Sequence, residues 1–219
     1  LNGINIEVKQ GDSIAILGPS GSGKSTLLGL LAALDTPTSG EIVLDGVALS
    51  GLNEEQKAAL RKQKVSFIFQ SFMLVDTLTA LENVMLPAEL AGVKDAKQKA
   101  QTMLNRVGLS HRLNHLPKQL SGGEQQRVAI ARAFICEPKV LFADEPTGNL
   151  DSVNGDKIAD MLFALNQESD TTLVLVTHDL HLAKRCARQL VMENGHLSEP
   201  YADNLKAAHV SAEHAEEVN

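Results

Sequence analysis

Aromatic side chains are scarce in this sequence, which has no tryptophan and a single tyrosine among its 219 residues. Without them the chain lacks the rings on which the bases of a single-stranded nucleic acid stack. Its formal net charge of −7 at pH 7 also argues against the basic surface that a nucleic-acid-binding protein needs to replace counterions. The sequence therefore predicts that no nucleic acid is a partner.

Cysteines and long apolar runs are also rare or absent. Cys136 and Cys186 lie far apart and neither belongs to a CxxC pair, so we predict two small buried hydrophobes in a reducing compartment, not a zinc or redox site. There is no run of about 18 apolar residues and no signal peptide, so neither a membrane span nor secretion is predicted. Because the first residue is Leu1 and not methionine, we expect the chain to begin inside a longer gene product.

What the sequence does contain is an alternation of strand-like and helix-like segments. Such an alternation favours an α/β fold with a mostly parallel sheet, helices on both faces and an N-terminal antiparallel β part. The expected strands are 3–10, 12–18, a pair within 40–49, 65–70, 139–145, 171–179 and a hairpin over 188–197. The expected helices are 24–34, 53–63, 79–91, 95–107, 153–167 and 180–186.

The character of the sequence changes between about Ser71 and Lys118, where helical patterns occur without a convincing strand. We therefore predict one domain over residues 1–219, with a nucleotide-binding core formed by 1–70 and 135–200 and an inserted helical subdomain over 71–134. Residues 201–219 are predicted to be a frayed helix or a tail, with His209 and His214 in solvent.

A glycine-rich loop follows the strand expected at 12–18. "GPSGSGKS" matches the pattern G-x-x-x-x-G-K-[ST], with an apolar strand before it and a helical run after it. In such a loop the backbone N–H groups and the positive end of the helix bind phosphates, Lys24 reaches the outer phosphates, and Ser25 offers its hydroxyl to Mg²⁺. A strand–helix turn that binds nothing is disfavoured, because a lysine and a hydroxyl at these positions have little structural purpose. The predicted nucleotide-binding residues are Gly18, Pro19, Ser20, Gly21, Ser22, Gly23, Lys24, Ser25 and Thr26.

Two acids end the apolar strand "KVLFADE". Neighbouring side chains of a strand point in different directions, so Asp144 can face a metal ion while Glu145 faces a water molecule. We predict that Asp144 binds Mg²⁺ and that Glu145 accepts a proton from the attacking water. A surface acid pair without function would be plausible by itself, but the glycine loop makes nucleotide hydrolysis the better hypothesis.

A second turn suited to an anion lies within "HLPKQLSGGEQQRVAIARAF", residues 115–134. Ser121 and Glu124 have the spacing of a capping box, which would explain both ends of the turn. Gly122 and Gly123 are not explained, because each glycine in a helical turn costs roughly 0.5–1 kcal/mol relative to alanine. One chain thus carries two candidate phosphate sites.

The glycine loop, "LSGGEQQR" and "LFADEPTGNLD" together resemble the ATP-binding subunit of an ABC transporter, over nearly the whole chain. The resemblance implies that two ATPase subunits pair head to tail as a homodimer, which places both sites equivalently. Ser121, Gly122 and Gly123, the family's signature, would then cover the γ-phosphate of the ATP held by the partner's glycine loop. The two turns of one chain would serve two different nucleotides.

The resemblance implies ATP and Mg²⁺ as cofactors and gives roles to three further residues. Gln70 would contact Mg²⁺ and the attacking water, His178 would contact the γ-phosphate, and Asp151 would lie at the dimer interface. The residues by themselves leave plainer alternatives open. Gln70 could simply end a strand, His178 could be structural beside the helix cap Asp179, and Asp151 could be a plain helix cap.

Residues 71–92 and 115–134 most resemble the lipoprotein-release and macrolide-export branch, although Asp76 stands where many relatives have a proline. This branch implies a separate integral-membrane permease, driven for export or for lipid or lipoprotein extraction. The chain would lie peripherally on the cytoplasmic face of the bacterial inner membrane. The family's adenine-stacking aromatic would lie upstream of Leu1.

Three non-transport functions are alternatives to this hypothesis. A DNA-repair clamp would need a long coiled coil between Lys24 and Asp144, and the sequence has no sustained heptads there. A translation factor would need two cassettes. A signalling ATPase of the cell-division type shares every motif named above and stays open as an alternative.

Overall fold

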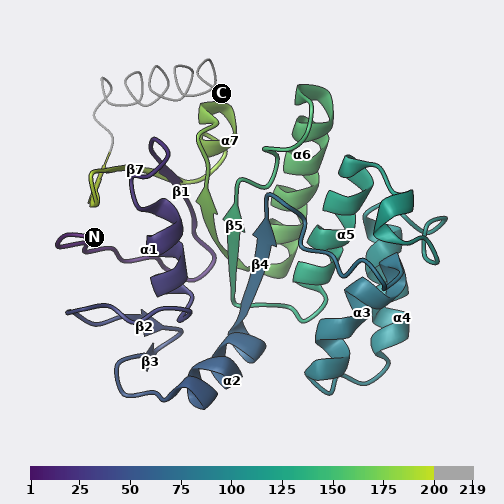
Figure 1. Ribbon diagram of the computed structural model, residues 1–219, viewed down its shortest axis with the longest axis horizontal. Helices are drawn as coiled ribbons and strands as arrows, with labels where there is room; N and C mark the ends of the chain where they lie inside the picture. Colours follow the sequence, from purple (N-terminus) through teal and green to yellow (C-terminus); the bar gives the residue numbers. More distant parts are fainter. Residues whose placement is uncertain (200–219) are drawn as a thin grey trace. The chain divides into compact units, whose positions relative to one another are not determined.

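The computed structural model describes residues 1–199 (Figure 1). The chain forms two compact units. Among the described residues, unit 1 comprises Leu1–Arg61, Phe142–Glu145 and 172–199, and unit 2 comprises Lys62–Leu141 and Pro146–Thr171. The division into a core and a helical subdomain at residues 71 and 135 stays a prediction. The tail over 201–219, with His209 and His214, lies outside the described residues.

The sheet of unit 1 contains three whole parallel strands, the last three residues of a further strand and one antiparallel strand. Their order is β5 (Val140–Asp144, of which Phe142–Asp144 belong to this unit), β6 (Thr172–Val176), β1 (Ser13–Leu17), β7 (Arg188–Glu193) and β8 (His196–Ser198). β1 runs parallel to both neighbours, with Ile14 opposite Val174 on one side and Arg188 on the other. β8 pairs antiparallel with β7. Every residue of β6 is buried, as expected for a strand covered on both faces.

Unit 1 also contains the helices and the hairpin that surround the glycine loop. α1 (Lys24–Leu31) follows the loop directly, and β2 (Val43–Leu44) and β3 (Val47–Ala48) form the expected antiparallel pair around a turn at Asp45 and Gly46. α2 (Glu54–Lys64) begins in this unit. α7 (Leu180–Ala183) ends three residues before the predicted boundary at 186.

One predicted strand was wrong. In the described part of the chain, residues 3–10 adopt no strand, although Ile4, Ile6 and Val8 alternate with polar residues and are half-buried. Alternation indicates one buried face, but a strand also needs a neighbouring backbone to complete its hydrogen bonds. No such ladder joins this segment to the other strands of unit 1.

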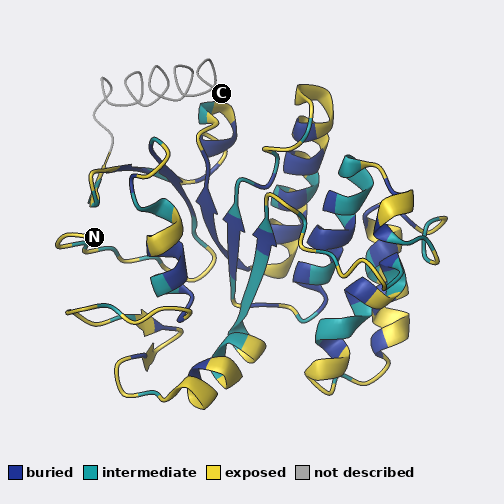
Figure 2. Cartoon of the chain, viewed as in Figure 1, coloured by how far each residue is buried: buried dark blue, intermediate teal, exposed yellow. Residues whose placement is uncertain are grey.

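Unit 2 is built around α5 (Gly122–Phe134), the helix that follows the second turn. This helix packs against α3 (Ala80–Leu90), α4 (Ala96–Arg106), α6 (Ser152–Ser169) and the strand β4 (Val65–Phe69). More than half of its residues are buried, and Figure 2 shows them as dark blue ribbon. A short 3₁₀ helix, η1 (Pro117–Gln119), precedes it. The helices predicted at 79–91 and 95–107 are confirmed as α3 and α4.

Local sequence signals explain where these helices begin. Thr79 and Glu82 form a capping box at α3, and Asp151 caps α6 by accepting a bond from the N–H of Asn154 at 3.1 Å. Among residues 1–199, no helix has the length and apolar character required to cross a bilayer.

Candidate functional site

The loop between β1 and α1 has a backbone that only glycine permits at two positions. A Cβ atom on Gly18 would lie 2.2 Å from the carbonyl oxygen of Met192, so no other residue fits there. Gly23 has a φ of 105° and stands at the N-cap of α1, where no side chain satisfies the first N–H groups of the helix. The amides at the start of α1 therefore have the arrangement that binds an anion.

Lys24 bends back over this loop. Its Nζ donates to the carbonyl oxygens of Gly18 at 2.7 Å and Pro19 at 2.9 Å. Burial lowers the pKa of the Lys24 ammonium, while the charges of Glu145 and Asp144 act in the opposite direction. A half-buried cation thus lies between the glycine loop and two acids, which favours a phosphate group at the loop.

Asp144, the last residue of β5, accepts a hydrogen bond from the side chain of Ser25. Burial raises the pKa of the Asp144 carboxyl, and so does the charge of Glu145, while Lys24 and Ser25 lower it. One carboxylate beside one hydroxyl fits Mg²⁺, which prefers oxygen ligands and completes its shell with phosphate oxygens and water. Residues 1–199 contain no cluster of three acid, histidine or cysteine side chains that would hold a metal ion without such help.

Glu145 is held at the carboxyl end of β6 by three contacts. Its carboxylate accepts bonds from Thr177 Oγ1 at 3.1 Å and from the backbone N–H of His178 at 2.9 Å, and it lies 2.8 Å from His178 Nδ1. Glu145 itself has a φ of 47°, a left-handed conformation that is strained for this residue type. Its backbone N–H donates to the carbonyl of Val176 at 2.9 Å. Asp144 and Glu145 thus contact different neighbours, Ser25 for the first and the end of β6 for the second.

Thr177 is a residue that sequence reasoning missed. It is completely buried, and its hydroxyl also accepts a bond from the N–H of Asp179 at 3.0 Å. A threonine after a strand gives no signal of such a role, because its partner Glu145 is 32 residues away in sequence.

The second turn opens into a hollow of about 560 Å³ in unit 2. Its predicted capping box is present, since Ser121 Oγ accepts from the N–H of Glu124 at 3.3 Å and the Glu124 carboxylate accepts from the N–H of Ser121 at 2.9 Å. The pKa of the Glu124 carboxyl lies below its usual range, mainly because its carboxylate accepts the bond from the Ser121 backbone N–H. The hollow is lined by Arg112, Ser121, Gly122, Gly123, Glu124, Arg127, Asn149, Leu150, Asp151 and Asn154.

The two glycines of this turn are not required by the fold of the chain. Both have ordinary helical backbones, and a Cβ would approach no atom closer than 3.6 Å at Gly122 or 3.9 Å at Gly123. Alanine would fit at each position and would favour the helix by roughly 1 kcal/mol. Their use here indicates that something outside the chain approaches the bare backbone.

Gln70 is joined to this hollow through Asn149, a second residue that sequence reasoning missed. Gln70 Nε2 donates to Asn149 Oδ1 at 3.2 Å, and Asn149 Nδ2 donates to the Gln70 carbonyl at 2.8 Å. Asp151 caps α6, and its bonds with Asn154 lower the pKa of its carboxyl. The predicted site residues therefore form two groups. Unit 1 brings together Lys24, Ser25, Asp144, Glu145 and His178, and unit 2 brings together Gln70, Ser121, Gly122, Gly123 and Asp151.

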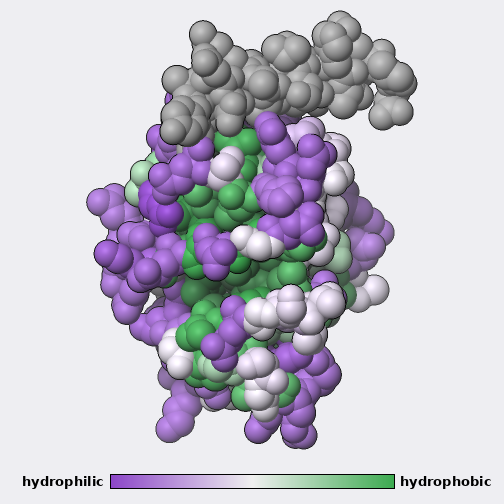
Figure 3. All heavy atoms as spheres, turned by 90° about the vertical axis from the view of Figure 1, so that its left-hand side faces the viewer, coloured by the Kyte–Doolittle hydropathy of each residue, from purple (hydrophilic) through white to green (hydrophobic). Residues whose placement is uncertain are grey.

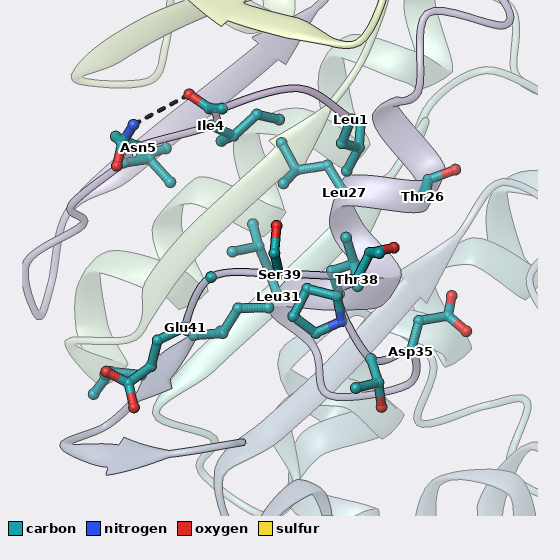
Figure 4. Close-up of a pocket in the computed structure, with 18 of the residues that line it drawn as sticks. Leu1, Ile4, Asn5, Thr26, Leu27, Leu31, Asp35, Thr38, Ser39 and Glu41 are labelled. Atoms are coloured by element: carbon teal, nitrogen blue, oxygen red, sulfur yellow. Dashed lines mark hydrogen bonds between the residues drawn. The ribbon is translucent and has the colours of Figure 1, made fainter.

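Unit 1 carries another hollow, of about 970 Å³, on the face that contains its N-terminal segment. Figure 3 shows apolar side chains gathered there, and Figure 4 shows that they come from the N-terminal residues, from α1 and from the segment before β2. The dashed bond in Figure 4 runs from Asn5 Nδ2 to the Gly3 carbonyl, 3.1 Å. Thr26 belongs to this lining, but the hollow is not lined by Lys24, Asp144 or Glu145.

Comparisons with known proteins show which family this chain belongs to. The family described as ABC transporter matches residues 1–148. The chain is 59% identical over 201 residues to the ABC transporter ATP-binding protein YbbA of Escherichia coli (strain K12), covering 91% of this chain and 88% of that protein. It is 53% identical over 199 residues to the lipoprotein-releasing system ATP-binding protein LolD of Legionella pneumophila (strain Lens), covering 90% and 88%.

A solved structure extends the likeness to three dimensions. The dimeric post-hydrolysis structure of the ATP-binding cassette MJ0796, bound to ADP and Pi, superposes with a TM-score of 0.82 at 40% identity, covering 91% of this chain and 90% of that one. The expected α/β fold with a mostly parallel sheet is confirmed by this match.

Proposed function

Since this chain belongs to the ABC transporter family as its ATP-hydrolysing subunit, we propose that unit 1 holds the γ-phosphate of one ATP while unit 2 offers its signature to the ATP of a second copy. One observation carries the proposal. The glycine loop with Lys24 belongs to unit 1, and the bare glycines of the hollow belong to unit 2, so the chain has two separate places for a phosphate. The described dimer of MJ0796 supports a pairing of two cassettes.

The loop would bind the phosphates of ATP through its backbone amides. The N–H groups at the start of α1 would donate to a phosphate, and Lys24 would exchange its bonds with the Gly18 and Pro19 carbonyls for bonds with the outer phosphate oxygens. Ser25 and Asp144 would hold Mg²⁺. The role of Gln70 toward Mg²⁺ and the attacking water stays a prediction. When bound, Mg²⁺ neutralises charge on the phosphate oxygens.

Glu145 would act as the general base. It accepts a proton from water as the water oxygen attacks the γ-phosphorus, and the bond from this phosphorus to the β–γ bridging oxygen breaks to give ADP and phosphate. Its carboxylate is oriented for this by Thr177 and by the backbone of His178. We propose that the His178 ring, steadied through Nδ1, contacts the γ-phosphate.

The loop over residues 71–78 would receive the permease. Two apolar side chains of this loop are exposed, Met73 at 59% and Val75 at 40%. The side chain of Asn83 is buried and binds the backbone of the loop. Asn83 accepts from the N–H of Val75 at 2.8 Å and donates to the carbonyls of Val75, Leu78 and Thr79 at 2.9–3.1 Å. An apolar surface on a rigid support suits a docking helix.

The permease would set the substrate, and the named function of LolD favours lipoprotein or lipid extraction, with export as the related action. Placement on the cytoplasmic face of the bacterial inner membrane follows from this role. The signalling function of the cell-division type would use the same ATPase and differs in its membrane partner.

Dimerisation is the direct test. Glu145→Gln should sediment as a monomer without nucleotide and as a dimer with ATP and Mg²⁺, because it retains both phosphate sites and turns over slowly. A Glu145→Gln chain that binds ATP and stays monomeric at high concentration would overturn the shared-site proposal.

A further inference from the structure

The segment after Gln70 has an uncommon backbone. Phe72 has a φ of 59° and Met73 a φ of 49°, so two consecutive residues other than glycine occupy the left-handed region. Each is disfavoured there, because its Cβ crowds the following carbonyl oxygen. Such a conformation persists only when the surroundings hold it in place.

Arg132 of α5 holds it. One end of its guanidinium, Nη2, donates to the carbonyl of Phe72 at 2.8 Å, and Nη1 donates to the carbonyl of Met73 at 2.6 Å. The planar fork of arginine can bind two adjacent carbonyls in this way, whereas a lysine offers a single point of charge. Arg132 is half-buried, and this burial lowers the pKa of its guanidinium.

The left-handed backbone at Phe72 and Met73 places the Phe72 ring next to Gly122 of the signature. A Cβ atom on Gly122 would lie 3.8 Å from Phe72 Cζ and 3.6 Å from Leu150 Cδ2, both ordinary van der Waals distances. Gly122 is the first residue of α5, and Leu150 lies between Asn149 and Asp151 in the lining of the same hollow. The half-buried Phe72 therefore reaches the signature, while its neighbour Met73 is exposed.

We propose that Arg132 is a positioning residue that acts through Phe72. By fixing two strained carbonyls, it keeps the Phe72 ring against Gly122 and Leu150, and so holds the signature turn in the shape that meets the partner's nucleotide. A helix pressing on Met73 would change the same backbone, so this contact links the docking loop to the signature. The inference rests on the proposed role of Ser121, Gly122 and Gly123 toward the second ATP.

A double-mutant cycle tests it on the isolated protein. Arg132→Met keeps an unbranched apolar stem and removes the guanidinium fork, and Phe72→Ala removes the ring. Each change is made in the Glu145→Gln background, where ATP-driven dimerisation is measured by sedimentation. We expect each single variant to weaken the dimer roughly tenfold or more, and the Arg132→Met/Phe72→Ala pair to be no weaker than either one.

Two further measurements separate positioning from general damage. ATP affinity of the monomer should stay unchanged, because the glycine loop belongs to unit 1. Hydrogen exchange should become faster at residues 122–124 in Arg132→Met, and should not change there in the matched control Arg106→Met, which removes an arginine of α4. Additive losses in the cycle, or unchanged exchange at 122–124, would overturn the inference.

The proposed function and this inference fail differently. If Ser121→Arg still dimerises with ATP, the signature does not serve the partner and the proposed function fails. If Ser121→Arg abolishes dimerisation while Arg132→Met does not weaken it, only the role of Arg132 fails. If Arg132→Met does not fold, the double-mutant cycle is repeated with Arg132→Lys and Phe72→Leu. Additive losses of dimerisation or unchanged hydrogen exchange at 122–124 would again overturn the inference.

Discussion

The carboxylate of Glu145 lies 2.8 Å from Nδ1 of His178 and accepts a second bond, 2.9 Å, from the backbone N–H of the same residue. A carboxylate oxygen accepts hydrogen bonds, so the 2.8 Å contact is a hydrogen bond when His178 Nδ1 carries a proton. The pair joins the residue after β5 to the loop after β6, and both belong to unit 1. It ties the proposed base to the residue proposed to contact the γ-phosphate.

Glu145→Gln should leave ATP binding nearly intact and reduce turnover by about 10²–10⁴-fold, the usual cost of losing a general base. The amide keeps the shape of the side chain and an oxygen for the bond from His178 N–H, but it cannot take a proton from water. ATP affinity and hydrolysis are to be measured on one preparation. Hydrolysis close to that of the unchanged protein would remove Glu145 from this role.

Thr177→Val should lower kcat without raising the KM for ATP. The two side chains have similar shapes, but valine cannot donate to Glu145 Oε2 or accept from the N–H of Asp179. We also expect a loss of about 1–3 kcal/mol in the free energy of unfolding, because the site is buried and a backbone donor loses its partner. The kinetic effect should vanish in the Glu145→Gln background. If it persists there, Thr177 does not act through Glu145.

Asp144→Asn should be more stable than the unchanged protein at neutral pH without nucleotide. Burial raises the pKa of Asp144 in the folded chain, so the folded state binds more protons than the unfolded state in the window above the ordinary carboxyl pKa. Stability therefore falls as pH rises through that window, and the advantage of asparagine should shrink as the solution is acidified. Melting temperatures at several pH values measure this. An Asn variant that melts lower at pH 7, with no pH dependence, would contradict the assignment.

The same Asp144→Asn protein should gain less thermal stability than the unchanged chain when ATP and Mg²⁺ are added together. ATP with a chelator provides the control, because the phosphates still bind Lys24 and the loop. Equal gains from Mg²⁺ in both proteins would argue that Asp144 does not hold the metal ion.

Met73→Asp should abolish association with the membrane fraction while soluble ATPase activity persists. Met73 is 59% exposed, so the charge costs little in the isolated fold but opposes an apolar docking helix. Leu34→Asp is a matched control, since Leu34 is 50% exposed and lies in unit 1. If Met73→Asp associates normally with membranes, the permease does not dock at the loop over residues 71–78.

The parts of this account that could be predicted from sequence are those built from neighbouring residues. The residues of the glycine loop, the two acids at the end of β5, and the capping box of Ser121 and Glu124 each lie within a few positions, so spacing and local chemistry describe them. The hairpins at Asp45-Gly46 and Asn194-Gly195 were predicted for the same reason.

The parts that sequence could not predict depend on distant contacts. Arg132 binds carbonyls about 60 positions away, and Asn149 binds Gln70 across 79. Nothing near Arg132 distinguishes it from an arginine on a solvated helix face. The strand predicted over residues 3–10 was wrong because the prediction rested on local alternation alone. Unit 1 provides no neighbouring strand with which this segment pairs.

The central claim, that the signature serves the partner's ATP, is tested most directly by mixing two damaged chains. Lys24→Ala cannot hold its own nucleotide, and Ser121→Arg blocks the hollow it offers to a partner. In a mixed dimer the intact loop of Ser121→Arg meets the intact signature of Lys24→Ala, so one complete site forms. We predict ATP hydrolysis above that of either variant alone. If mixed dimers form, a one-site control is active and no hydrolysis returns, both phosphate-binding turns act within one chain and the account is wrong.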